Sequence, residues 1–528
     1  MSKLKLFLNP ALFGFFFIFF LFVHNREQVL YRDLIIPLSM MAVVVMVSVC
    51  ICYFIFRRNA QKTELAATFI LVFFFAYGFI FDFSGAGSYW IRHRYLLPIW
   101  VLIFFGGILA IFISRRNLEK LSRGISFIFL GMTALSALLL MRYEVFTDDF
   151  PIPSIDSAQV EIAKNAAHAI ETLPDIYYIL PDAYASSWAL EKYYGYDNSA
   201  FVDFLEKKGF YVVPKSRSNY TGTAFSMASL LNIEYLEKLS ADGKVSRRNT
   251  NPRKLIEENR VGPFFQDLGY SYIHLGSWWE GDFRVPQADE NINKGIMSEF
   301  MLMLFKRTVI YPASYTYGLL DDRYITWQRM RYQLDEVAKI PLREEPTFTF
   351  FHLGAPHGPQ VFNADGSFIE TLESELARNA DDENVKDISL QKKYYPGQLT
   401  YVTVRLEELI DIILSQSKTP PIIVIQSDHG SSLFSRSDPD YERNRLKNFS
   451  AFYLPEIKDK NGKVLGGDDA MWGDITPVNT FRLLFNEYFG AGFVYLPDIS
   501  YAFSDKVNEH PDWSLVDVTD LVANDYEK

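Results

Sequence analysis

The chain has 528 residues, 49% of them hydrophobic, and a formal net charge of −11. Residues 1–143 hold 14 basic and 5 acidic side chains, a charge of +9, and the remainder holds 38 and 58, a charge of −20. An acidic soluble part argues against nucleic acid as a partner. The two cysteines, Cys50 and Cys52, lie in an apolar run, so the soluble part has neither a disulfide framework nor a cysteine nucleophile.

Five apolar segments precede residue 143 and predict a membrane domain. They span residues 6–23, 34–56, 65–81, 95–114 and 125–141. The second and fourth are long enough to cross a bilayer, and the other three are at the short end of the range for a membrane span. A cleaved signal peptide is the alternative for the first segment, but Pro10 and its long phenylalanine-rich core disfavour it.

The basic residues between these segments predict their orientation. Nine lysines and arginines fall on the side of the N-terminus and five on the other, which places the N-terminus in the cytoplasm. Five crossings of the cytoplasmic (inner) membrane then place everything after Arg142 outside. We therefore expect a multi-pass transmembrane domain of five helices (1–143), a juxtamembrane linker (144–173) and an extracytoplasmic domain (174–528).

Short apolar runs typical of strands alternate with helical patterns in the soluble part. Strands are predicted at 175–180, 209–213, 270–275, 348–353, 421–425 and 449–454, and helices at 157–172, at 188–204, from 223 onward, at 395–415 and at 472–485. This alternation predicts an α/β domain with a central, mostly parallel sheet.

Acidic and imidazole side chains directly follow two of the predicted strands. Asp182 follows the first, and Asp428 and His429 follow the strand that begins at 421. Loops at this edge of an open α/β sheet are where ligands usually bind, and Gly430 lets the backbone turn tightly behind the two residues. The alternative is a loop aspartate that caps a helix beside a surface histidine.

Further polar candidates lie at other loop ends. A helix is predicted to begin near Thr223, where a hydroxyl either caps the helix or faces a bound phosphate, and Thr221 and Ser226 compete with Thr223 on composition. His352 and His357 flank a Gly/Pro loop after another strand. The remaining candidates for substrate binding are Arg217, Asn219 and the tandem tryptophans Trp278 and Trp279, which could instead pack under their loop.

The candidates at one edge of the sheet combine two carboxylates, imidazoles and a hydroxyl: Asp182, Thr223, His357, Asp428 and His429. This mixed oxygen and nitrogen set predicts a divalent metal site that suits Zn²⁺ or Mn²⁺ better than Ca²⁺. The metal would lower the pKa of the hydroxyl and shield the charge of an anionic ester.

The order of motifs resembles the alkaline-phosphatase/sulfatase superfamily, in particular its membrane-anchored branch of phosphoethanolamine transferases and lipoteichoic acid synthases. Thr223-Ala-Phe-Ser226 is similar to the stretch that carries their threonine nucleophile, residues 352–359 match H-x-x-G-x-H-G-P, and residues 427–430 match the metal-binding D-H-G. The resemblance implies five spans and an extracytoplasmic catalytic domain with Thr223 as nucleophile. It also implies that His357 contacts substrate or a second metal, and that Asp182, Thr223, Asp428 and His429 are metal ligands.

The sequence also departs from that superfamily. No further histidine follows His429 until His510, so a histidine-rich second zinc site is not expected, and the C-x-P-x-R motif of formylglycine sulfatases is absent. Three functions remain open. The first is a phosphotransferase that moves a phospholipid headgroup phosphate onto an envelope glycan or lipid. The second is a phosphodiesterase or phosphatase that uses water, and the third is a membrane-anchored binding protein without activity.

Overall fold

The computed structural model describes residues 3–26, 29–56, 59–83, 93–146, 154–239, 252–294, 298–312, 321–371, 388–503 and 515–527. The chain forms two compact units. One comprises Met1–Thr147 together with Ile296–Asp322, and the other comprises Asp148–Gly295 and Arg323–Lys528.

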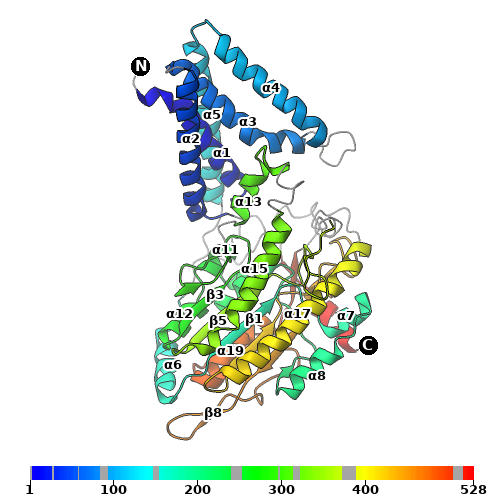
Figure 1. Ribbon diagram of the computed structural model, residues 1–528. Coiled ribbons are helices and arrows are strands. Elements are labelled where there is room, and N and C mark those ends of the chain that lie inside the picture. Colours follow the sequence, from blue (N-terminus) through cyan, green and yellow to red (C-terminus); the bar gives the residue numbers. More distant parts are fainter. Residues whose placement is uncertain are drawn as a thin grey trace. The chain divides into compact units, whose positions relative to one another are not determined.

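The described residues of the first unit form five long apolar helices, as the hydropathy pattern predicts (Figure 1). They are α1 (Leu8–His24), α2 (Ile35–Ile55), α3 (Ala60–Phe83), α4 (His93–Ile113) and α5 (Glu119–Phe146). Within the described residues, four helices are long and apolar enough to cross a membrane, and α1, with 17 residues, is shorter. The third and fifth helices extend beyond the predicted segments because their polar ends continue the same helical hydrogen bonding.

Hydrogen bonds formed by buried polar side chains join three of these helices. The amide of Asn9 donates to the backbone oxygen of Ser122 at 3.0 Å, and the Ser122 hydroxyl donates to Glu64 at 2.9 Å. These contacts link α1, α3 and α5, which also share a core of phenylalanines. Hydrogen bonds of this kind hold membrane helices together where the hydrophobic effect between helices is weak.

The first unit also includes a segment that the sequence analysis did not predict there. Helix α13 (Glu299–Lys306) buries Phe300, Met301 and Leu304 in the core of the apolar helices. The backbone after α13 then hydrogen-bonds to α3, with Val309 N donating to Phe74 O at 2.9 Å. Gly78 permits this approach, because a Cβ there would lie 2.7 Å from the backbone of Arg307.

The second unit is built on a seven-stranded sheet in the order β2-β7-β6-β1-β5-β3-β4. Its strands are β1 (Ile176–Pro181), β2 (Tyr211–Val212), β3 (Ser271–Leu275), β4 (Glu290–Asn291), β5 (Thr347–Leu353), β6 (Ile422–Gln426) and β7 (Ser450–Tyr453). The central neighbours β6, β1, β5, β3 and β4 pair in parallel, and β7 pairs antiparallel with β6 and β2. The predicted α/β fold with a mostly parallel sheet is confirmed.

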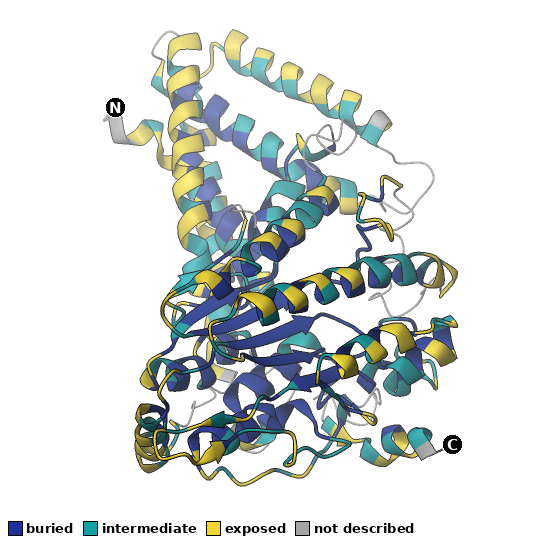
Figure 2. Ribbon diagram, turned by 60° about the horizontal axis from the view of Figure 1, so that its bottom comes forward, coloured by how far each residue is buried: buried dark blue, intermediate teal, exposed yellow. Residues whose placement is uncertain are grey.

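Helices cover both faces of this sheet, and its strands form the buried centre of the unit (Figure 2). Alternate strand residues point to opposite faces, so Tyr178 and Phe350 enter one core and Ile179 and Phe351 the other. The first core is closed by α6 (Ser157–Ala169), α9 (Thr223–Asn232), α11 (Pro252–Glu257), α12 (Val261–Asp267) and α19 (Pro477–Phe489). The second is closed by α7 (Ser187–Tyr194), α8 (Ser199–Lys207), α15 (Asp322–Val337) and α17 (Ile388–Gln416).

Candidate active site

The register of the sheet aligns the two predicted acidic residues. β1 lies between β5 and β6, and Ile179 pairs with Ile425. Three residues further on, the same register brings Asp182 opposite Asp428, each at the carboxyl end of its strand. The backbone of Asp182 is fixed from the other side, because its N–H donates to Leu353 O at 2.9 Å. Parallel pairing therefore collects residues that are 246 positions apart in sequence.

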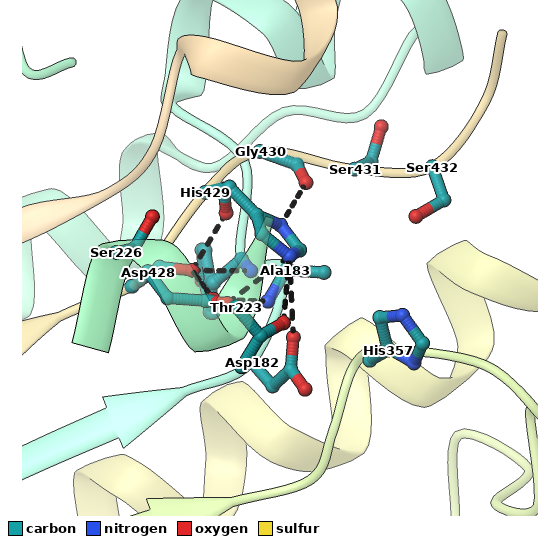
Figure 3. A network of polar contacts seen from close by, with 12 residues as sticks. Asp182, Ala183, Thr223, Ser226, His357, Asp428, His429, Gly430, Ser431 and Ser432 are labelled. Carbon is teal, nitrogen blue, oxygen red and sulfur yellow. Dashed lines mark hydrogen bonds and ion pairs between the residues drawn. The ribbon is translucent and has the colours of Figure 1, made fainter. Parts of the chain in front are cut away.

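Asp182, Asp428 and His429 form a buried group, which we call the ligand cluster. One potential ligand atom from each lies within 4.8 Å of the other two. His429 Nε2 is 3.0 Å from Asp428 Oδ2 and 3.8 Å from Asp182 Oδ1 (Figure 3). Those two carboxylate oxygens are buried and have no hydrogen-bond donor among the described residues. Leaving buried carboxylate oxygens unpaired is costly, so a divalent cation fits this donor set.

The other polar atoms of His429 and Asp428 form hydrogen bonds outside the cluster. The lone pairs that remain therefore face one another. His429 Nδ1 donates to Gly430 O at 2.8 Å, since a carbonyl can only accept, and this leaves the Nε2 lone pair as a ligand. Asp428 Oδ1 accepts from the N–H of Ala183 at 3.2 Å. Ala183 has a positive φ of 63°, which turns that N–H back toward the site.

Gly430 has a steric reason to be glycine. A Cβ at this position would lie 2.1 Å from Asn444 O and 2.7 Å from Lys447 O. No side chain fits that space, so the loop behind His429 can be this close to the neighbouring segment only with glycine at 430.

Thr223 is the first residue of α9 and adds its hydroxyl to the ligand cluster. Its Oγ1 is 3.0 Å from His429 Nε2, and Gly222 rather than Thr223 occupies the N-cap position. The competing candidates lie differently. Ser226 is buried and donates to Tyr220 O at 3.0 Å, and Thr221 is buried with its carbonyl oxygen accepting from Arg445 at 2.7 Å. Of the three hydroxyls, that of Thr223 is the one hydrogen-bonded to His429.

His357 lies beside the ligand cluster on the loop after β5. Its ring centre is 6.3 Å from that of His429, and its backbone N–H donates to Asp182 O at 2.9 Å. Its Nδ1 donates to Gly358 O at 2.6 Å, so Nε2 is the nitrogen left to exchange a proton with a ligand. The ring is partly exposed, unlike that of His429.

The electrostatics of the ligand cluster are unequal. Burial raises the pKa of Asp428 to about 6, and the Asp182 carboxylate contributes to the increase. Burial acts in the same direction on Asp182, but the neighbouring imidazoles, that of His357 foremost, outweigh it and lower the pKa of Asp182. Burial, followed by the charge of Arg445, holds the pKa of His429 well below its usual range, so its imidazole is neutral and can act as a ligand.

His352 forms a second buried group with Asp282, which we call the His352 pair. Its Nδ1 is 2.7 Å from Asp282 Oδ2 and its Nε2 is 3.4 Å from Asp182 Oδ2. Burial lowers the pKa of His352, but the two carboxylates, first that of Asp282, outweigh it and keep the pKa well above its usual value. His274 reinforces Asp282 from the other side, with Nε2 donating to Asp282 O at 2.7 Å. Asp282 was not predicted as a site residue.

The predicted substrate-binding residues are mostly buried. His352 has no exposed surface and faces Asp182, a placement that suits positioning of that carboxylate. Arg217 donates to Asp474 at 3.1 Å and to Asp498 O at 2.8 Å, and the Asn219 amide donates to Thr476 at 2.9 Å. A contact of these three residues with substrate stays a prediction.

The tandem tryptophans are placed differently from each other. Trp279 is 6% exposed and packs edge-on against the ring of His352, with ring centres 6.2 Å apart. Trp278 is partly buried. Trp279 therefore packs against the His352 pair, and a wall for a sugar or headgroup formed by both rings stays a prediction.

The sequence matches no protein-family model and no curated protein. Solved structures with a similar fold include the C-terminal periplasmic domain of EcEptC from Escherichia coli, at 11% identity and a TM-score of 0.42 over 67% of this chain and 97% of that one. The periplasmic domain of phosphoethanolamine transferase EptC from Campylobacter jejuni is 13% identical, with a TM-score of 0.33 over 60% and 90%.

A third neighbour is the soluble domain of lipooligosaccharide phosphoethanolamine transferase A from Neisseria meningitidis, at 12% identity and a TM-score of 0.31 over 54% of this chain and 77% of that one. A Bacteroides thetaiotaomicron protein assigned as a sulfatase is 13% identical, with a TM-score of 0.39 over 64% and 75%. At these values the function has to be inferred from the chain's own site. The structural neighbours are thus phosphoethanolamine transferase periplasmic domains and sulfatases, the classes of protein that the motifs of this sequence resemble.

Proposed function

We propose that the chain is a metal-dependent phosphotransferase. It would move a phospho-headgroup of the phosphoethanolamine or phosphoglycerol type from a membrane phospholipid to a hydroxyl of an envelope glycan or lipid. The observation that carries the proposal is the Thr223 hydroxyl, 3.0 Å from His429 Nε2, beside two buried carboxylate oxygens that lack a donor among the described residues. A nucleophile hydroxyl next to a cation site is the arrangement that covalent phosphoryl transfer requires.

Asp182, Asp428, His429 and the Thr223 hydroxyl would hold one divalent ion. Three oxygens and one neutral imidazole nitrogen suit Zn²⁺ or Mn²⁺, and four ligands satisfy the tetrahedral preference of zinc. When bound, the ion supplies a positive charge that lowers the pKa of the Thr223 hydroxyl and offsets the charge of the phosphate.

The chain's own groups would then carry out two displacements. In the first, Thr223 Oγ1, having lost its proton to solvent, attacks phosphorus, and the bond from phosphorus to the diacylglycerol oxygen breaks. His357 Nε2 gives a proton to that departing oxygen. In the second, the acceptor hydroxyl attacks the phospho-threonine and His357 Nε2 takes its proton, while the bond to Thr223 Oγ1 breaks. His357 therefore ends protonated again, and Thr223 Oγ1 ends as a hydroxyl once it takes back from solvent the proton it lost at the start.

The apolar helices support a lipid donor. Four helices in the described part of the chain can cross a membrane, so the chain is anchored to the bilayer that contains the phospholipids. We propose that this is the inner membrane and that the second unit lies on its extracytoplasmic side, since the basic residues favour a cytoplasmic N-terminus.

The test is intact-mass analysis of the full chain after incubation with phospholipid vesicles and zinc. Vesicles of phosphatidylethanolamine and of phosphatidylglycerol are used separately, and Thr223→Ala is the control. We expect a mass increase of one headgroup phosphate with one of the two lipids and none with the variant. Release of the free headgroup phosphate without an added acceptor would indicate water as the acceptor. The absence of any adduct and of any product from either lipid would contradict the proposal.

A further inference from the structure

Helix α18 (Tyr441–Leu446) lies directly against the loop that carries the ligand cluster. The N–H of Gly430 donates to Arg445 O at 2.7 Å, and the side-chain amide of Asn444 donates to Ser431 O at 2.7 Å while accepting from the Ser431 hydroxyl at 2.9 Å. Three hydrogen bonds thus fix α18 on the residues that follow His429. The position of Arg445 relative to the site is set by these contacts.

The Arg445 guanidinium joins the loop of the ligand cluster to the loop of the nucleophile. Its Nε donates to Thr221 O at 2.7 Å, two residues before Thr223, and its Nη1 donates to the hydroxyl of Ser432, three residues after His429. In Figure 3, Ser432 and His357 both lie on the side of His429 away from Ser226.

Arg445 differs from the other cations of this region in having no carboxylate partner among the described residues. Arg443, on the same short helix, pairs with Asp525 at 3.1 Å, and His352 lies between two carboxylates. Of the five N–H groups of the Arg445 guanidinium, two donate to groups in the described part of the chain, Thr221 O and the Ser432 hydroxyl. A partly buried guanidinium with three unused donors and no counter-charge is matched to an anion.

The charge balance of the site favours such a group. The two carboxylates of the ligand cluster neutralise a divalent ion, so an incoming phosphodiester or phosphomonoester brings a negative charge that the ion does not balance. We propose that Arg445 is the phosphate-binding residue of the site, donating to a non-bridging oxygen of the phosphoryl group that Thr223 attacks. The guanidinium would then take the place of a second metal ion, which the shortage of histidines after His429 disfavours. This inference rests on the proposed function.

The experiment measures binding of inorganic phosphate to the full chain with zinc, by equilibrium dialysis in detergent. Every variant is made in the Thr223→Ala background, so that no covalent adduct forms. We expect Arg445→Gln to weaken phosphate binding about 10- to 100-fold, the usual contribution of hydrogen bonds to a charged group. Arg445→Lys keeps the charge but not the planar fork and should fall between Arg445→Gln and the parent.

The matched control is Arg443→Gln, which removes a charge from the same helix but one that already has carboxylate partners. It should leave phosphate binding unchanged. If Arg445→Gln lowers the melting temperature but binds phosphate as tightly as the parent, Arg445 only braces the two loops and the inference is wrong. Arg445→Gln could lose phosphate binding while the parent chain, which retains Thr223, forms no adduct with phospholipid. The phosphate site would then be correct and the proposed transferase function wrong.

Discussion

Two buried groups of carboxylates and imidazoles meet at Asp182, and they differ in how their charges are balanced. In the His352 pair, each ring nitrogen of His352 faces a carboxylate, at 2.7 Å from Asp282 and 3.4 Å from Asp182. In the ligand cluster, His429 already donates its Nδ1 proton to Gly430 O, so no proton lies between His429 Nε2 and Asp428 Oδ2, 3.0 Å apart. Burial of acids and histidines is common to both groups. Asp282 Oδ1 also has no hydrogen-bond donor among the described residues, but it lies 3.4 Å from His274 Nε2. The unpaired oxygens of Asp428 and Asp182 instead face the Nε2 lone pair of His429, and this convergence of lone pairs is what distinguishes a cation site.

The largest effect should come from removing the Thr223 hydroxyl, which contacts the ligand cluster and not the His352 pair. We expect Thr223→Ala to lower phosphotransfer by about 10⁴-fold or more, because the covalent step has no substitute nucleophile. Zinc content and melting temperature should stay near those of the parent, since the two carboxylates and His429 remain. Radiolabelled transfer from phospholipid and elemental analysis measure the two quantities. If Thr223→Ala transfers normally and Thr221→Ala is inactive, the nucleophile is misassigned.

The second substitution places a hydrogen-bond donor between residue 428 and His429 Nε2. Asp428→Asn removes one of two buried negative charges and can place an N–H₂ group toward His429 Nε2, while its oxygen still accepts from Ala183 N. We therefore expect the metal-free variant to melt at a higher temperature than the metal-free parent. Added zinc, worth about 4 kcal/mol of stability to the parent at 1,000 times its dissociation constant, should no longer stabilise the variant.

Thermal melts of the full chain with and without zinc give both results. If the metal-free Asp428→Asn variant were less stable than the metal-free parent and still bound zinc, the ligand cluster would not be the cation site. Asp335→Asn is a suitable control, since Asp335 is an exposed carboxylate on α15 whose partner, Arg405, is 3.5 Å away. Removing an exposed ion pair of this kind should change the melting temperature little.

A third substitution disturbs the balanced group. Asp282→Asn leaves His352 with a weaker partner and frees its ring to turn from Asp182, so the ligand carboxylate is less well oriented. We expect zinc affinity to fall about 10- to 100-fold, the usual effect of losing a residue that orients a ligand. Competition with a zinc chelator measures this affinity, and an unchanged value would show that the His352 pair has no part in metal binding.

The sequence predicted the strand ends of the site because parallel pairing needs little more than apolar runs of the right length. Asp182, Asp428 and His429 follow such runs directly, and the register then brings them together. Thr223 was predicted at the start of a helix, and α9 begins at that residue. Each prediction rested on local sequence alone.

The rest of the structure depends on packing that local patterns do not contain. Asp282 reaches His352 only because β3 lies beside β5 in the sheet and the loop after β3 brings Asp282 to that histidine, and nothing in its sequence sets Asp282 apart from other loop acids. The predicted helix 188–204 is two helices, because Gly195 adopts a positive φ of 62° and ends α7. Helix α13 was missed because eight residues with three buried apolar side chains give too short a pattern.

The smallest expected effect is that of Ser226→Ala, which tests whether Thr223 or Ser226 is the nucleophile. Ser226 is 2% exposed, donates to Tyr220 O at 3.0 Å and lies 3.2 Å from the Ser218 hydroxyl, which itself donates to the backbone oxygen of Asp428. Ser226→Ala should therefore cost about 1 kcal/mol of stability, one buried hydrogen bond, which lowers the melting temperature by a few degrees. Transfer should stay within about tenfold of the parent, because Asp428 keeps its bond from Ala183 N. A variant that retained zinc and its melting temperature but lost all transfer would make Ser226 the reacting hydroxyl, and the assignment of Thr223 would then be wrong.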